Sequence, residues 1–218
     1  DGLLALAEAY ATPLAGGDLA EAPLAVADIV LVGAVRQGRA LLRSGARAGD
    51  LLYVTGNLGG AAAGLVRLGE LAERAGKPPA IGKKMQGLLA AHLLPRPRIA
   101  QGLWLQRRGL ATAALDLSDG LSTDLEHLCE ESGVDAEVDA ALLPLHPAAA
   151  MSQALHGGED YELLFATSPE ARIPRVIAGV EVTRIGRVVR RQTGWPEMTL
   201  VTAEGRKRLE RQGWEHFA

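Results

Sequence analysis

The spacing of apolar residues predicts helical and extended segments that alternate irregularly along the first half of the chain. Apolar side chains recur every three to four positions in 2–10, which predicts a helix, and a Pro- and Gly-containing break follows it. The stretch 23–35 is rich in Val and Ile and predicts one strand or a bent pair of strands. A further strand is expected over 51–56. Helices are then expected over 59–76, 84–94 and 98–109, with a loop over 77–83.

The second half begins with a buried strand over 110–117, followed by a helix over 121–132 that Gly133 would terminate. Alternating patterns predict later strands over 134–139, 161–167, 180–189 and 198–203. In the second of these strands we expect Tyr161, Leu163 and Phe165 on one face. Glu162 is interpreted as part of the polar face of that strand.

The segment 168–179 predicts one more helix, with Ser168 as its N-cap and Pro169 in its first turn. The irregular mixture of helices and strands favours an α+β fold over a regular doubly wound sheet. A polar stretch near 44–50 predicts a boundary between domains 1–46 and 47–218.

Composition narrows the classes of protein. The chain has 218 residues, 48% of them hydrophobic, which is enough for a sizeable core. Its net charge of −3 gives no reason to expect nucleic acid or an anionic membrane as partner. The single cysteine, Cys129, excludes an internal disulfide framework and is expected to be a small buried apolar residue. No apolar run is long enough to cross a bilayer and no signal peptide is visible, so a cytoplasmic protein is expected.

The start of the sequence gives a separate expectation. The chain begins with Asp1, inside what already reads as a helix. We therefore expect that part of an N-terminal domain is missing from this sequence.

The strongest chemical signal is the turn "LDLSDG" between the strand at 110–117 and the helix after it. Asp116, Ser118 and Asp119 fall within four residues there. One interpretation is that Ser118 or Asp119 caps the helix. The other is that the two carboxylates bind Mg²⁺, which prefers oxygen ligands and shares its shell with phosphate and water.

Three weaker signals lie elsewhere. In "HGGED" the paired glycines allow a sharp turn or a close approach to a ligand, and Glu159 and Asp160 follow them. "GGDL" offers Gly17 and Asp18 as a backbone cradle with a further carboxylate, although a plain surface turn would use the same residues. Arg43 could hold a phosphate through bidentate hydrogen bonds or could simply be solvated.

Several other mechanisms are not indicated. There is no phosphate-binding G-x-x-x-x-G-K-[ST] loop and no kinase-type G-x-G-x-x-G loop. The five histidines are scattered, so no Ser/His/Asp arrangement is suggested. His127 is expected to be a surface or otherwise satisfied residue rather than a ligand.

Together these stretches resemble the thiamine-monophosphate kinase family of the aminoimidazole ribonucleotide synthetase superfamily. The matching motifs are "GGD" at 16–18, "GRALLRSGARAGDLLYVTGNLGGAAAGL" at 38–65, "HLLPRPRIAQG" at 92–102, "LDLSDGLSTDLEHL" at 115–128, "LPLH" at 143–146, "ALHGGEDYELLF" at 154–165 and "GWEHF" at 213–217. The G-G-E-D-Y-E-L-L motif is the most discriminating of these.

The resemblance implies the end of an N-terminal α/β domain, used for ATP and Mg²⁺ binding and for dimerisation, followed by a C-terminal α+β domain of the synthetase type. It implies transfer of the γ-phosphoryl group of ATP to thiamine monophosphate, giving thiamine diphosphate and ADP, by a homodimer with more than one Mg²⁺ ion. Because the acceptor is already an anionic phosphate oxygen, no catalytic side chain is expected beyond electrostatic and metal assistance.

By position, the resemblance implies a role for each candidate residue. The metal ligands would be Asp18, Asp116 and Asp119. Gly17, Asp18, Arg43 and Ser118 would contact ATP, and Glu159 and Trp214 would contact the thiamine end of the substrate.

The sequence departs from the family at Leu19, where Thr is usual, at His156, where Ser is common, and in a short stretch before Leu155. Two alternatives stay open. The protein could be another ATP-dependent enzyme of the superfamily, or the chain could be a non-catalytic remnant that binds nucleotide.

Overall fold

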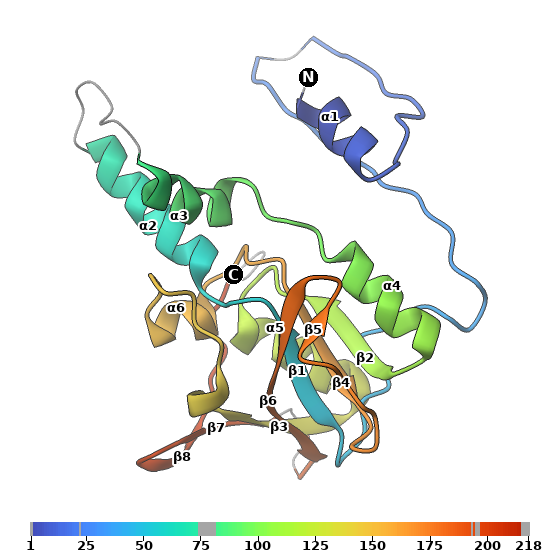
Figure 1. The fold of residues 1–218 in the computed structure, drawn as a ribbon, viewed down its shortest axis with the longest axis vertical. Helices are drawn as coiled ribbons and strands as arrows, with labels where there is room; N and C mark the ends of the chain where they lie inside the picture. The colour runs from blue at the N-terminus through green and yellow to red at the C-terminus, as the bar shows by residue number, and fades with distance from the viewer. Residues whose placement is uncertain (1, 22, 74–81, 193, 195–196, 215–218) are drawn as a thin grey trace. The chain divides into compact units, whose positions relative to one another are not determined.

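The computed structural model describes residues 2–21, 23–73, 82–192, 194 and 197–214 (Figure 1). The chain forms two compact units, 1–34 and 35–218. The expected loop at 77–83 and the end of the expected helix at 59–76 lie largely outside the described residues.

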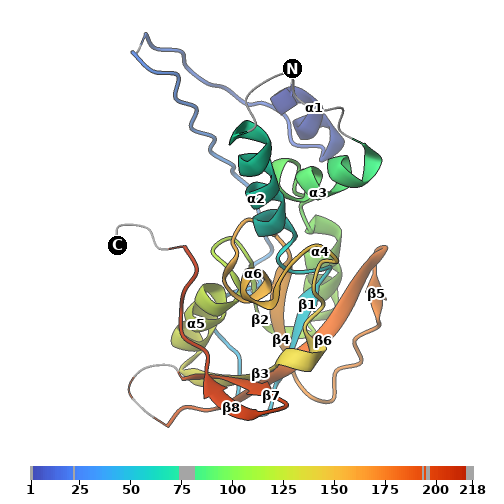
Figure 2. The same ribbon diagram turned by 90° about the vertical axis from the view of Figure 1, so that its left-hand side faces the viewer.

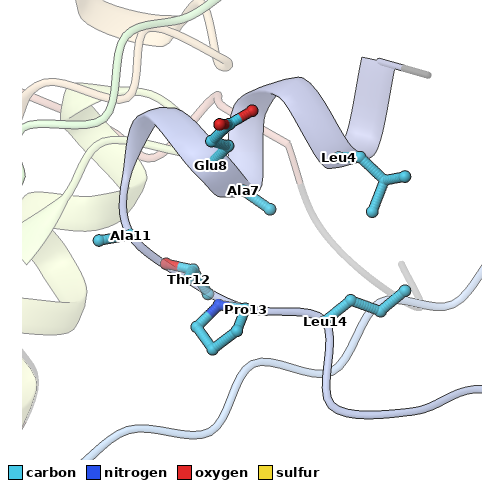
Figure 3. Close-up of a pocket in the computed structure, with 7 residues that line it drawn as sticks. All are labelled: Leu4, Ala7, Glu8, Ala11, Thr12, Pro13 and Leu14. Atoms are coloured by element: carbon cyan, nitrogen blue, oxygen red, sulfur yellow. The ribbon is translucent and has the colours of Figure 1, made fainter.

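The first unit contains the predicted N-terminal helix, α1 (Gly2–Ala9). The helix ends where the backbone N–H of Thr12 donates to the carbonyl of Ala7 (2.8 Å). A cavity of about 440 Å³ lies beside this helix and the chain after it (Figure 3), lined by Leu4, Ala7, Glu8, Ala11, Thr12, Pro13 and Leu14. The lining is apolar apart from Glu8 and Thr12, so it carries no evident chemistry.

The predicted strand or strand pair at 23–35 is wrong. This segment has no strand in the structure, and its Val, Ile and Leu side chains are exposed, Val32 to 93%. A β-strand needs a neighbour for its backbone N–H and C=O groups. No other described segment of the first unit pairs with these residues, so their β propensity is not realised.

The second unit is built on one twisted, mixed sheet. Its strands are β1 (Leu51–Thr55), β2 (Ala111–Asp116), β3 (Val134–Asp139), β4 (Leu163–Thr167), β5 (Val176–Ile177), β6 (Val180–Arg190), β7 (Met198–Thr202) and β8 (Gly205–Arg208). They follow the order β2-β4-β1-β6-β3-β7-β8, and β5 pairs with β6. The described pairings are antiparallel except that of β3 with β7.

Helices cover the two faces of this sheet (Figure 2). The helices of the second unit are α2 (Gly60–Glu73), α3 (Lys83–Leu93), α4 (Ile99–Arg108), α5 (Leu121–Ser132) and α6 (Met151–His156), with a short 3₁₀ turn, η1 (Ala140–Leu142). On one face α5 buries Leu121, Leu125 and Leu128 against the sheet. On the other face Leu105 of α4 packs near Phe165, whose ring stacks on that of Tyr53 with centroids 5.4 Å apart.

Most predicted elements of the second unit are confirmed. The helix predicted at 121–132 ends in Gly133, which has the left-handed conformation expected of a helix C-cap (φ 68°, ψ 35°). In β4, Phe165 and Leu164 face the α4 and α5 sides of the sheet respectively, as the alternation predicted. Cys129 is fully buried in the core, as expected. The sequence did not predict α6 or β8.

The helix predicted at 168–179 is wrong. Ser168 begins only a turn, and Val176–Ile177 forms β5 against β6. Pro174 has no N–H to donate to a carbonyl one turn back, which disfavours a helix through this segment. The chain instead reverses at Ala178 and Gly179, both with positive φ (46° and 80°), as in a tight hairpin.

The observed class is the predicted mixed α+β. Of the described helices, none has the length and apolar character needed to span a membrane.

Candidate functional site

The turn between β2 and α5 is shaped by a residue that sequence reasoning overlooked. The carboxylate of Asp124 accepts hydrogen bonds from the backbone N–H groups of Asp119 (3.0 Å) and Gly120 (3.1 Å). Gly120, at φ 107°, is the N-cap residue of α5. The interpretation of Ser118 or Asp119 as the side-chain cap is therefore wrong. Because Asp124 supplies the acceptor, the carboxylate of Asp119 is not used for capping.

A second loop, 157–162, packs directly on this turn through backbone groups. The N–H of Glu159 donates to the carbonyl of Ser118 (2.8 Å), and the N–H of Tyr161 donates to the carbonyl of Leu117 (2.9 Å). A Cβ at Gly158 would lie 2.5 Å from the Ser118 carbonyl oxygen, so only glycine allows this approach.

Two non-glycine residues of the same loop have left-handed backbones. They are Glu159 (φ 71°) and Tyr161 (φ 49°). Such conformations cost energy and persist where the surrounding structure enforces them, often beside functional sites. The hydroxyl of Tyr161 lies 3.4 Å from a carboxylate oxygen of Glu159.

A third segment reaches the turn from the C-terminal end of the described chain. The backbone N–H of Trp214 donates to the carbonyl of Asp119 (3.0 Å). Residues more than ninety positions apart in the sequence therefore meet at one place.

These three segments, together with α2 and α3, line a cavity of about 570 Å³. It is lined by Ala62, Leu65, His92, Ser118, Asp119, Gly157, Gly158, Glu159, Tyr161 and Trp214. Four residues singled out from the sequence thus share one cavity: Ser118, Asp119, Glu159 and Trp214.

Asp116 is the exposed last residue of β2, two positions before Ser118, which lines the cavity. Its negative charge, like that of Asp119, contributes to raising the pKa values of Asp124 and Tyr161. Burial is the largest cause in both cases, and it raises the pKa of Asp124 to about 6.

The acidic groups at this turn are suited to a divalent cation. Ligand atoms of Asp119, Asp124 and His127 lie within 4.8 Å of one another. Among the described residues, no lysine or arginine forms an ion pair with Asp116 or Asp119. Carboxylates that lie close together without a basic partner repel one another. Their oxygens are the ligands that Mg²⁺ prefers. His127 adds an imidazole, which suits that ion less well.

Three predicted residues are not brought to this cavity by the described contacts. The carbonyl of Arg43 accepts from the hydroxyl of Ser132 (3.1 Å), at the last residue of α5. Because that helix has 12 residues, its two ends are about 18 Å apart. Gly17 and Asp18 are exposed residues of the first unit, whereas the cavity lies in the second. Their roles stay predictions from the sequence.

Glu162 is buried, which corrects its interpretation as the polar face of a strand. Only 5% of the residue is exposed, and β4 begins one residue later. Its carboxylate accepts from the hydroxyl of Thr55 (2.6 Å) and from the Nε of Arg98 (2.5 Å). Glu162 lies immediately before the first residue of β4. Its side chain points inward, where a buried carboxylate requires a charged partner.

Asp160 is a further acid whose position the sequence did not reveal. Its carboxylate accepts from the backbone N–H groups of Gly59 (2.6 Å) and Ala61 (3.0 Å) at the start of α2. Burial raises its pKa to about 6, although the backbone hydrogen bonds act in the opposite direction. Of the two acids in "GGED", one therefore faces the cavity and the other holds a helix terminus. No local signal in the sequence separates them.

Comparison with known proteins identifies the family. Residues 47–195 match the family model described as AIR synthase related protein, C-terminal domain. Thiamine-monophosphate kinase of Escherichia coli strain K12 is 39% identical over 230 residues, covering 100% of this chain and 67% of that protein.

Solved structures agree with the sequence match. A crystal structure of thiamine-monophosphate kinase from Stenotrophomonas maltophilia is 34% identical with a TM-score of 0.61, covering 75% of this chain and 54% of the other. A structure described as AaThiL complexed with AMPPCP and TMP is 35% identical with a TM-score of 0.65, covering 81% and 54%. The chain thus aligns with about half the length of these solved chains and two thirds of the E. coli protein. It belongs to the thiamine-monophosphate kinase family, within the AIR synthase-related superfamily.

Proposed function

We propose that the protein containing this chain transfers the γ-phosphoryl group of ATP to thiamine monophosphate, producing thiamine diphosphate and ADP. The observation that carries this proposal is the single cavity that Ser118, Asp119, Glu159 and Trp214 line in a member of this family. A relative in the family has a structure described as a complex with AMPPCP and TMP, which supports a site for both substrates.

The acidic turn is proposed to bind the metal that this reaction requires. Asp116 and Asp119 would hold Mg²⁺, and Asp18 is retained as a ligand from the resemblance alone. When bound, the metal neutralises the charge of the polyphosphate, which two anionic reactants require before they can approach each other. Asp124 fixes the conformation of the turn, because its carboxylate accepts hydrogen bonds from the backbone N–H groups of Asp119 and Gly120.

Both substrates would bind at the cavity. The hydroxyl of Ser118 would contact ATP beside the acidic turn. Gly17 and Arg43 are retained as ATP contacts from the resemblance alone. Glu159 and Trp214 would bind the thiamine end, where a carboxylate and an indole ring both favour a cationic thiazolium. The acceptor oxygen of thiamine monophosphate is already anionic, so the reaction needs positioning rather than a general base.

We also propose that 1–46 is the end of an N-terminal domain for ATP binding, Mg²⁺ binding and dimerisation, and that 47–218 is the C-terminal domain. The family match begins at residue 47, which is consistent with that division. A homodimer and a cytoplasmic location are retained as proposals from the resemblance.

The test uses the whole protein with ATP, thiamine monophosphate and Mg²⁺, with thiamine diphosphate measured by chromatography. Asp116→Asn and Asp119→Asn should each lower turnover by about 100-fold or more, because each removes charge at the metal turn. Circular dichroism should show no unfolding. Glu130→Gln, which changes an exposed acid on α5, is the matched control and should retain turnover.

Other outcomes would favour the alternatives. Consumption of ATP on a different substrate, with thiamine monophosphate untouched, would move the assignment to a sister enzyme of the superfamily. Calorimetry with a non-hydrolysable ATP analogue would identify a remnant if the analogue bound tightly and no turnover occurred.

A further inference from the structure

The segment from Leu209 to Trp214 runs from β7 to the first turns of α5 and is held at both. Leu209 is buried in the core, and its N–H donates to the carbonyl of Met198 (2.8 Å). Arg211 forms an ion pair with Glu126 on α5 (3.3 Å). The N–H of Trp214 then reaches the carbonyl of Asp119 at the acidic turn.

Gly213 lies where this segment comes closest to the turn. A Cβ at this position would be 2.0 Å from the carbonyl oxygen of Asp119 and 2.5 Å from Oγ1 of Thr123. Both distances are well inside van der Waals contact. Since Gly213 does not have a positive φ, its requirement for glycine comes from space and not from backbone conformation.

Neither neighbour of Gly213 can yield easily. The Asp119 carbonyl lies between the N–H groups of Asp119 and Gly120, and Asp124 accepts hydrogen bonds from both. Thr123 is 2% exposed on the first turn of α5, so its hydroxyl cannot rotate away into solvent. A side chain at Gly213 would therefore displace the C-terminal segment and not the turn.

We propose that Gly213 is a positioning residue for substrate recognition. Only a residue without a side chain lets the N–H of Trp214 reach the Asp119 carbonyl, and this hydrogen bond places the indole at the cavity beside Ser118 and Asp119. The proposal rests on the function proposed above, in which Trp214 contacts the thiamine end of the substrate. It adds that recognition of this end depends on the backbone of the metal-binding turn.

The test compares Gly213→Ala, Trp214→Leu and the double variant in the whole protein, with KM for thiamine monophosphate, KM for ATP and kcat measured separately. Gly213→Ala and Trp214→Leu should each raise KM for thiamine monophosphate about tenfold, the order expected for loss of one aromatic contact to a cationic ring. The double variant should match the single variants, because both remove the same contact. KM for ATP should stay within about twofold.

Gly69→Ala is the matched control. Gly69 is an exposed glycine in α2, and a Cβ there would meet nothing within 4 Å, so this variant should keep every kinetic constant. The proposal is overturned if Gly213→Ala leaves KM for thiamine monophosphate unchanged while Trp214→Leu raises it. It is also overturned if the effects of the two substitutions add in the double variant. Absence of turnover in the unmodified protein would instead refute the proposed function itself.

A second measurement covers the case in which Gly213→Ala fails to fold. Hydrogen exchange in the unmodified protein should show that the Trp214 amide is protected, because it donates to Asp119. Exchange at the rate of a free peptide would overturn the proposal without any variant.

Discussion

Breaking the ion pair between Glu162 and Arg98 should be among the more destabilising single changes in this protein. The Glu162 side chain is 6% exposed and that of Arg98 is 17% exposed, so water screens the pair weakly. Two nitrogens of the guanidinium donate to the two carboxylate oxygens. The Thr55 hydroxyl donates to one of those oxygens and accepts from the N–H of Leu163 (2.8 Å).

Replacing one partner leaves the other charge buried without compensation, which typically costs about 3–5 kcal/mol. Glu162→Gln should fall at the lower end, about 3 kcal/mol, since its amide oxygen can still accept from Thr55. Arg98→Met should cost a similar amount because it strands the carboxylate. The double variant should cost clearly less than the sum, with a coupling energy of about 2 kcal/mol or more.

Urea unfolding followed by circular dichroism measures these differences. With a slope of about 2 kcal/mol per molar urea, a loss of 3 kcal/mol would move the midpoint by about 1.5 M. Arg187→Met is the matched control. Arg187 pairs with Glu137 but is 60% exposed, so its loss should cost less than about 1 kcal/mol. Additive effects of Glu162→Gln and Arg98→Met, each near 1 kcal/mol, would refute the reasoning.

The other predictions concern buried groups. Folded Asp160 has a pKa of about 6, above its ordinary 3.8, so folding takes up a proton and the free energy of unfolding should fall by about 3 kcal/mol as pH rises from 4 to 6. Asp160→Asn should flatten that fall in urea titrations, and an unchanged dependence of stability on pH would contradict the assignment. Burial raises the pKa of the Cys129 thiol to about 12, so a thiol reagent such as dithionitrobenzoate should react only after denaturant is added. Rapid labelling of the native protein would be inconsistent with this burial. Gly186→Ala should lower the free energy of unfolding by more than about 2 kcal/mol, because its Cβ would lie 2.0 Å from the Glu137 carbonyl oxygen across the sheet; an unchanged thermal midpoint would show that the strands can separate there.

Features encoded by neighbouring residues could be predicted from the sequence. The helix at α5 has apolar residues at helical spacing and ends in a glycine, and both signals act within a few residues. The acidic turn before it is likewise visible as a cluster of Asp116, Ser118 and Asp119. These are the elements on which sequence and structure agree.

Features that depend on distant partners could not be predicted in the same way. Glu162 looked like one polar position in an alternating strand, and its partner Arg98 lies 64 residues away. The segment 23–35 has the composition of a strand, but a strand also needs a pairing neighbour, and none of the described residues provides it. At 168–179 the Ser-Pro start suggested a helix, while pairing with β6 decided the outcome.

The site itself combines both kinds of information. The consecutive carbonyl groups of 117–119 each accept a hydrogen bond, from Tyr161, Glu159 and Trp214 respectively. Backbone groups therefore join the three segments, and this leaves the side chains around the cavity available for ligands. The same three peptide groups fix both the acidic turn and the residues proposed for the thiamine end. A change that shifts the turn should therefore alter both the proposed metal binding and the proposed substrate recognition. Catalysis by positioning requires such rigidity, since charged groups must be held at fixed places before the phosphates arrive.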